Sequence, residues 1–448
     1  MVAAVARGST VDAEGLFYMH KKLTKLLSDA NIYPVSLSAD GSETERSTQR
    51  LIAQSADSHR HYVIPNNQPG CSIEITIPLF NNRPSVLCQD SKHGKKTARN
   101  QLQSGARFIV FACMPIYFSM LATMVKNVLC PLFKSDVVNA DKQDDRAAAR
   151  LFSAKMLEFQ LENHSADRGL SVYLFVLGEL IDGWQSRNIP HLERARMIMR
   201  AKFFLMAWRS HIVAHPDYKV NVQFISRESY EIFLNLCDSL LALILAYRTW
   251  YPTYPLLPWL HSTEPCEHLF GLLRQLKRDF NYSDMLYLEP KLRVLMLGEF
   301  GNLTTEQKAN ETASGYHHTY FKADDLDLEA LFQYPTDQDL SDASKIAFEE
   351  AGQLLASVGI NAPAMLKAYK PPTPTPPKKP IITTVPRQPQ TMLELLALYD
   401  GTSFKTTKDE DEYEACEMAV AAEALDKSLA MFVSLPSLPF ALLMSTQK

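Results

Sequence analysis

The chain has 448 residues, of which 46% are hydrophobic and 21% are charged, as in a globular protein with a sizeable core. Its formal net charge of −4 excludes a globally basic binder of nucleic acid, so such binding requires local basic patches. The seven cysteines are scattered without a Cys-x-x-Cys pair, which argues against a zinc finger and a disulfide framework. We expect no signal peptide, because the first fifteen residues lack a sufficient apolar run.

The first ninety residues show one helical pattern followed by strand patterns. Residues 11–30 have the apolar spacing of a helix, which a proline at position 34 would end. Residues 35–40 alternate as a strand does and stop at Asp40-Gly41, a turn signal. Residues 72–79 alternate in the same way, and a short apolar run at 84–88 precedes Asp90.

The segment after this last strand has a regular basic pattern. Asp90, His93, Lys96 and Arg99 recur at every third position, and Asn100 follows. An aspartate at the end of a strand, followed by a basic helical turn, is suited to holding a metal near a phosphate.

Residues 108–125 contain no charged side chain over 18 positions, which is the lower limit for a membrane span. Because Pro115 interrupts this segment, we expect it to be a buried part of the core. Between 142 and 249 the apolar spacing is helical, and no convincing strand interrupts it. The basic side chains in this region either face DNA or are solvated. They are Arg194, Arg196, Arg200, Lys202 and Arg209.

Two carboxylates lie three residues apart in the stretch 261–271. A helix that starts here would place Glu264 and Glu267 on one face, with Pro265 in its first turn. The plainer alternative is a solvated helix start, because acids are favoured at the positive end of any helix. Two histidine pairs, 211 with 215 and 261 with 268, raise a zinc alternative that the lack of an accompanying cysteine disfavours.

The pattern Asp-x-x-His-x-x-Lys-x-x-Arg-Asn at 90–100 resembles the second-aspartate motif of P-element-type and related eukaryotic transposases. The stretch Glu-x-x-Glu-His-Leu-Phe-Gly-x-x-Arg at 264–274 resembles their final acidic motif. The resemblance covers roughly residues 33–300 and is close to fungal proteins of the hAT and P-element superfamily. It implies an α/β fold that is predominantly helical overall, with an RNase H-like mixed sheet core interrupted by a large all-α insertion.

The implied organisation has six parts. The core would be discontinuous because the insertion splits it before the last acid. The parts are 1–140 for the first part of the core, 141–258 for the helical insertion, 259–310 for the last part of the core with the final acidic helix, 311–370 for a helical C-terminal extension, 371–390 for a proline-rich linker and 391–448 for a helical tail.

The resemblance also implies a site. Asp40, Asp90 and Glu267 would be catalytic ligands of Mg²⁺ or Mn²⁺, with Glu264 as an auxiliary acid. Asp40 takes this role by position alone, and a simple Asp-Gly turn is the alternative. His93 would orient the Asp90 turn. Three basic side chains would bind DNA phosphates, namely Lys96, Arg99 and Arg274.

The function that follows is cutting and joining of DNA, at transposon ends or in target DNA, by a two-metal mechanism. We expect a nuclear homo-oligomer that does not span a membrane. Relatives carry an N-terminal zinc-binding module for DNA recognition, and this chain has no Cys/His cluster before Asp40. A truncated or inactive copy is therefore a further expectation. The alternative is a domesticated DNA-binding or scaffolding protein without catalysis.

Overall fold

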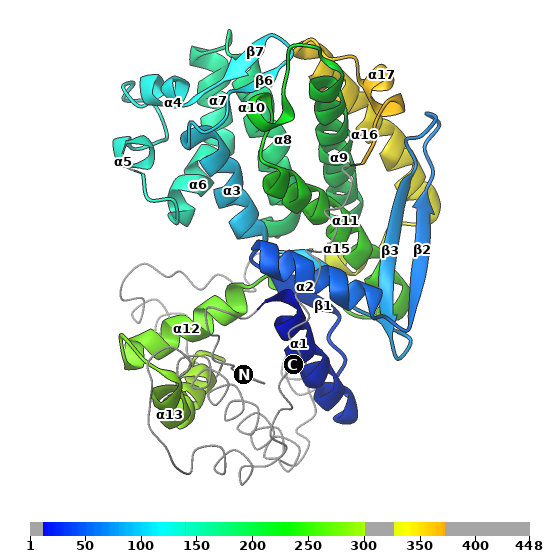
Figure 1. Cartoon of the computed structure of the whole chain (residues 1–448), viewed down its shortest axis with the longest axis vertical. Coiled ribbons are helices and arrows are strands. Elements are labelled where there is room, and N and C mark those ends of the chain that lie inside the picture. The colour runs from blue at the N-terminus through cyan, green and yellow to red at the C-terminus, as the bar shows by residue number, and fades with distance from the viewer. Residues whose placement is uncertain (1–11, 139, 301–326, 372–448) are drawn as a thin grey trace, which may run out of the picture. The chain divides into compact units, whose positions relative to one another are not determined.

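The computed structural model describes residues 12–138, 140–300 and 327–371 (Figure 1). The chain divides into two compact units. One comprises Met1–Tyr33, Ser47–Ile52 and Thr373–Lys448, and the other comprises Pro34–Arg46 and Ala53–Pro372. The expected tail at 391–448, and the proline-rich linker apart from its first residue, lie outside the described residues. The six-part organisation stays a prediction.

The described part of the first unit is mainly α1, Ala13–Asp29, which confirms the helix expected within 11–30. Asp12 begins this helix by accepting a hydrogen bond from the Gly15 N–H at 2.9 Å. The hydroxyl of Thr48, in the middle of α2 (Glu43–Gln54), donates to the Ala13 carbonyl at 3.2 Å.

The strands expected at 35–40, 72–79 and 84–88 are present, and four further strands were not predicted from sequence. β1 (Ser36–Ala39) pairs in parallel with β5 (Val86–Gln89), and β2 (Ser58–Ile64), β3 (Ile73–Phe80) and β4 (Arg83–Pro84) form an antiparallel sheet. β6 (Ile109–Phe111) and β7 (Met114–Ile116) form a separate hairpin. Within the described ranges the strands make three small sheets, so the single mixed sheet of an RNase H-like core is not confirmed.

The larger unit is mostly helical, as expected. The helices after β5 are α3 (Ser91–Gln103), α4 (Phe118–Met124), α5 (Lys134–Val137), α6 (Asp145–Leu151), α7 (Ala154–Asn163), α8 (Arg168–Gln185), α9 (His191–Ala214), α10 (Val220–Gln223) and α11 (Arg227–Trp250). A 3-10 turn, η1 (Pro258–Leu260), then precedes α12 (Glu264–Leu276) and α13 (Tyr282–Phe300). The last described helices are α15 (Leu328–Phe332), α16 (Asp337–Ser357) and α17 (Ala362–Lys367). Helices α8, α11, α16 and α17 pack around α9 (Figure 1), and most residues of α9 are buried.

The uncharged segment 108–125 forms β6, β7 and α4, and it belongs to the core as expected. Ile109, Phe111 and Leu121 are each at most 1% exposed. Among the helices that the structure describes, α11 is long and apolar enough to cross a membrane. Its most apolar stretch is 78% buried inside the protein, as in the core helix of a globular domain.

Two tryptophans of the helical region pack in the core instead of facing solvent. Trp184 and Trp208 are each 1% exposed. Their indole N–H groups donate to the carbonyls of Leu236 at 3.0 Å and Val110 at 2.8 Å. Because both rings are buried, neither can stack on an unpaired base in this conformation.

The basic side chains of α9 bind other parts of the protein, so this helix does not form the DNA-facing surface considered above. Arg194 is fully buried and donates to the carbonyls of Gly183 and Ser186, both at 2.6 Å. Arg200 forms ion pairs with Glu179 and Glu350. These contacts link α9 to α8 and α16, and the charge of Arg200 is neutralised by acids on both of those helices.

Candidate acidic site

The parallel pair β1 and β5 places two aspartates at the same edge of a sheet. Ala39 pairs with Gln89, and the Asp90 N–H donates to the Ala39 carbonyl at 2.8 Å. Asp40 and Asp90 are therefore the first residues beyond the carboxyl ends of neighbouring strands. This edge is where open parallel sheets commonly bind ligands.

Asp90 is 1% exposed, and both of its carboxylate oxygens are engaged. Oδ1 accepts from the backbone N–H groups of Lys92 at 2.7 Å and His93 at 3.0 Å. Oδ2 accepts from Thr263 twice, from its N–H at 2.8 Å and from its hydroxyl at 2.6 Å. A carboxylate has about four acceptor positions, so these four donors use its full capacity.

The hydrogen bonds also determine the charge of Asp90. Burial by itself would raise the pKa of this carboxyl, but the interactions with His93 and Thr263 outweigh burial and hold the pKa well below its usual range. Asp90 begins α3 as its N-cap residue, and its other oxygen lies against the first residues of α12. The positive ends of two helix dipoles thus favour one buried anion.

The Thr263 contact joins segments that lie 173 residues apart in the chain. Because Thr263 immediately precedes α12, this contact brings Glu264 and Glu267 close to Asp90. The Glu264 carboxyl group contacts the Lys92 side chain. The Nδ1 atom of His93 lies 3.8 Å from Asp90 Oδ1 and 3.9 Å from Glu267 Oε1, too long for hydrogen bonds but close enough for attraction between charges. His93 thus lies between two of the predicted acids.

The charges at this site shift the ionisation of their neighbours. Burial, together with the charges of Asp90 and Glu267, raises the pKa of Glu264 to about 8. The Asp90 carboxylate raises the pKa of His93, against the opposing effect of burial. An orienting role for His93 is compatible with this position and stays a prediction.

Asp40 is exposed and contacts an acid that the sequence analysis did not single out. The Asp40 N–H donates to Glu45 Oε2 at 3.2 Å, and Asp40 Oδ1 accepts from the Ser42 N–H at 3.0 Å. Gly41 has a φ of +92°, a conformation that favours glycine, and the role of Asp40 as a metal ligand stays a prediction. Burial and the proximity of Asp40 raise the pKa of Glu45 to about 7. The sequence contained a signal for this contact, because Glu45 lies in the first turn of α2, the helix that follows Asp40.

Two of the three basic residues expected to bind DNA phosphates are buried. Arg99 is 0% exposed and donates to the carbonyls of Asp141 at 2.6 Å and Asp144 at 2.8 Å. Its guanidinium anchors the loop before α6, so the predicted phosphate contact is wrong for this conformation. Lys96 is 8% exposed and pairs with Asp145 at 3.2 Å, so it too faces the protein. Arg274 is exposed on α12, and its role stays a prediction.

The chemistry of the predicted acids suits a hard cation, but their arrangement does not fit one. Mg²⁺ requires several converging oxygen ligands. No group of three or more His, Cys, Asp or Glu side chains within the described ranges is placed to hold a metal ion. Asp90 has no acceptor position left, because its oxygens bind the two helix starts. We therefore derive no metal-dependent step from this arrangement. The zinc alternative likewise gains no support from the described histidines.

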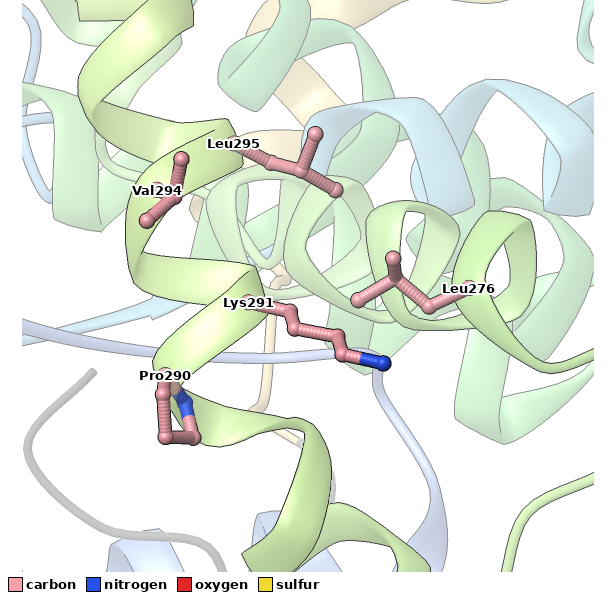
Figure 2. A pocket seen from close by; sticks show the side chains of 5 residues that line it. All are labelled: Leu276, Pro290, Lys291, Val294 and Leu295. Atoms are coloured by element: carbon pink, nitrogen blue, oxygen red, sulfur yellow. The ribbon is translucent and has the colours of Figure 1, made fainter.

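A shallow apolar pocket of about 420 Å³ lies between α12 and α13. Figure 2 shows its lining side chains, which are Leu276, Pro290, Lys291, Val294 and Leu295. Leu276 ends α12, whereas Glu264 begins it, so the two residues are separated by about 18 Å along the helix. The pocket is therefore not part of the acidic site.

Glu264→Gln is expected to stabilise the protein more at pH 8.5 than at pH 6. The pKa of Glu264 is about 8 in the folded protein, against about 4.3 in an unfolded chain. Ionisation therefore costs stability as the pH rises between these values, and the full cost is present above the higher one. Solvent screening limits the gain to roughly 1 kcal/mol. Melting temperatures of both proteins across this pH range measure it, with Glu289→Gln on α13 as control. A gap that does not change with pH would contradict the prediction.

Comparison with known proteins yields one structural likeness. No protein family model matches the chain, and no curated protein matches it. Among solved structures, the chain is similar to the Drosophila P element transposase strand transfer complex, with 13% sequence identity and a TM-score of 0.43. The match covers 59% of this chain and 59% of that chain. A likeness this distant concerns the fold alone, and membership of the hAT group and a fungal origin stay predictions.

Proposed function

We propose that this chain is a transposase-related protein that cuts and joins DNA, with the acidic site as its reaction centre. The observation that carries the proposal is the contact of Thr263 with Asp90. This contact joins the two segments whose patterns resemble transposase motifs, and it places Glu264 and Glu267 beside the strand-end aspartate. The motifs were identified separately, so their meeting at one point supports a shared function.

The proposal includes partners and a cation class that follow from the same resemblance. The substrate is DNA, and the proposed cofactor is Mg²⁺ or Mn²⁺, because carboxylate oxygens are the ligands these ions prefer. Glu264 and Glu267 are the acids whose side chains reach solvent at the start of α12, at 15% and 46% exposure. A homo-oligomer in the nucleus is the proposed setting.

One observation favours the alternative of a DNA-binding or scaffolding protein without catalysis. Asp90 already has a structural function, because its carboxylate caps α3 and anchors the start of α12. A protein that had lost catalysis would retain this residue for stability alone.

A nicking assay on supercoiled DNA distinguishes the two functions. Purified protein is incubated with Mg²⁺ or Mn²⁺ over a range of concentrations, with EDTA as the control. We expect nicking that requires the divalent ion and saturates with it. DNA binding in a gel-shift experiment, without nicking at any ion concentration, would support the alternative and contradict catalysis.

A further inference from the structure

Strand β2 lies at the edge of its sheet. The strand order of this sheet is β2-β3-β4, so within the described residues β2 pairs with β3 on one side only. Figure 1 shows β2 as the outer strand of its hairpin with β3. The residues from Ser58 to His61, and Val63 after them, are exposed. An edge of this kind presents backbone N–H and C=O groups that can pair with a further strand.

The pairing on the other side of β3 shows which residues of β2 face the open edge. The Pro78 carbonyl of β3 accepts a hydrogen bond from the Ser85 N–H at 3.0 Å, on the side of β4, so it is directed away from β2. Pro78 lies opposite His59. Successive residues of an antiparallel strand direct their backbone groups to alternate sides. The N–H and C=O groups of His59, His61 and Val63 therefore face the open edge, where no described backbone group pairs with them.

Other elements hold this edge strand in place. The hydroxyl groups of Tyr62 and of Thr249 on α11 lie 2.8 Å apart, within hydrogen-bond distance. Just after β2, the Ser341 hydroxyl donates to the Pro65 carbonyl at 3.2 Å, which links the end of the strand to α16. A strand that is already held in its extended form loses little freedom when it pairs, so association costs less.

We propose that β2 pairs antiparallel with β2 of a second copy of this chain, across a two-fold axis at His61. In this register His61 lies opposite His61 of the second copy, and His59 lies opposite Val63. All of the outward N–H and C=O groups then have partners. Arg60 lies opposite Tyr62 of the second copy, where a guanidinium over an aromatic ring is favourable. In its own chain the Arg60 guanidinium already lies 5.5 Å from the centroid of the Tyr62 ring.

The edge is thus complementary to itself, which favours a second copy over an unrelated segment. The inference names an interface for the proposed homo-oligomer and rests on that part of the proposed function alone. One pair of added strands buries less surface than a standard protein interface, so we expect a dissociation constant in the micromolar range.

Sedimentation equilibrium of the full chain across micromolar concentrations is expected to show a monomer and a dimer. His61→Pro removes the outward N–H, and proline is tolerated in an edge strand where this N–H faces solvent. Because two hydrogen bonds are lost at the axis, the dissociation constant is expected to rise at least about tenfold. His61→Thr keeps the N–H and is expected to dimerise within about twofold of the wild type.

Two results of this experiment would overturn the proposal. A wild type that stays monomeric would leave the edge of β2 to a segment of another protein. Equal dissociation constants for His61→Pro and His61→Thr would show that the outward N–H is not part of the interface. Melting curves of both variants establish that they are folded.

Hydrogen exchange on the wild type gives a test that does not depend on a variant folding. The amides of Arg60 and Tyr62 face β3 and are expected to exchange slowly at every concentration. The amides of His61 and Val63 are expected to exchange fast in the monomer and slowly in the dimer. Fast exchange of these two amides in the dimer would place the interface elsewhere. Slow exchange in the monomer would mean that another part of the chain covers the edge. Either result would overturn the proposal.

Failure of the proposed function gives a different result. A dimer that forms through β2 but does not nick DNA would refute catalysis and support the interface. A wild type that nicks DNA as a monomer would support catalysis and overturn the interface.

Discussion

Glu267→Gln is expected to lower the rate of divalent-dependent DNA nicking at least about 100-fold, the usual scale for losing a group that handles a proton or charge in the reaction. Its melting temperature is expected to stay within about 1 °C of the wild type, because substitutions at exposed positions rarely change stability. The side chain of Glu267 is 46% exposed, and its ionic contact with His93 is 3.9 Å long. Nicking rates at saturating Mn²⁺, with melting curves of the same preparations, measure both quantities.

A matched control separates the site from the general charge of the surface. Glu289→Gln removes the same charge from an exposed position on α13. It is expected to nick DNA at the wild-type rate. If Glu267→Gln nicks as fast as this control, then Glu267 does not take part in the reaction. If both variants lose activity equally, the effect comes from net charge and not from the acidic site.

The positions of the two strand-end aspartates could be predicted because the sequence signals are local. Alternation of apolar side chains indicates a strand, and Asp40 and Asp90 each come directly after such a pattern. The parallel pairing of these strands, with Ala39 opposite Gln89, is not encoded locally, because it depends on how the chain between them folds. The same limit applies to the contact of Thr263 with Asp90, which spans 173 residues.

The errors of the sequence analysis concern arginines. Arg99 and Arg194 each lie in a run of basic residues, which indicates a solvated or phosphate-binding face. In the structure both are fully buried, and their guanidinium groups bind backbone carbonyls. The guanidinium group is planar and carries five donors in fixed directions, so it can bind several carbonyls at once. The pattern of charges along the sequence does not show whether an arginine binds a carbonyl or a phosphate. Burial depends on packing by distant elements, so the pattern alone did not predict it.

Asp90→Ala is expected to destabilise the larger unit by about 3 kcal/mol, the largest effect on stability that we expect at this site. The substitution removes the acceptor of four hydrogen bonds and leaves the starts of α3 and α12 without their shared partner. A lost cap costs about 0.5–2 kcal/mol at each helix. Each buried N–H left without a partner adds to this cost. Urea denaturation at pH 7 measures the loss.

Asp144→Ala is the matched control, because Asp144 caps α6 alone by accepting from the N–H groups of Arg146 and Ala147. We expect it to lose about 1 kcal/mol. Equal losses in the two variants would contradict the shared anchoring by Asp90.

The pH dependence provides a second check on Asp90. Because the folded pKa of Asp90 is depressed, its stabilisation is fully present above the unfolded value of about 3.9 and is lost as the pH falls further. The contribution of Asp90 itself to the stability gap between the wild type and Asp90→Ala should therefore shrink below pH 4. A gap that instead grows below pH 4 would mean that Asp90 is not an anion in the folded protein. Asp90→Ala is expected to reduce stability, so a loss of nicking by this variant could come from unfolding as well as from the reaction. Glu267→Gln is expected to keep its stability and therefore tests the reaction alone.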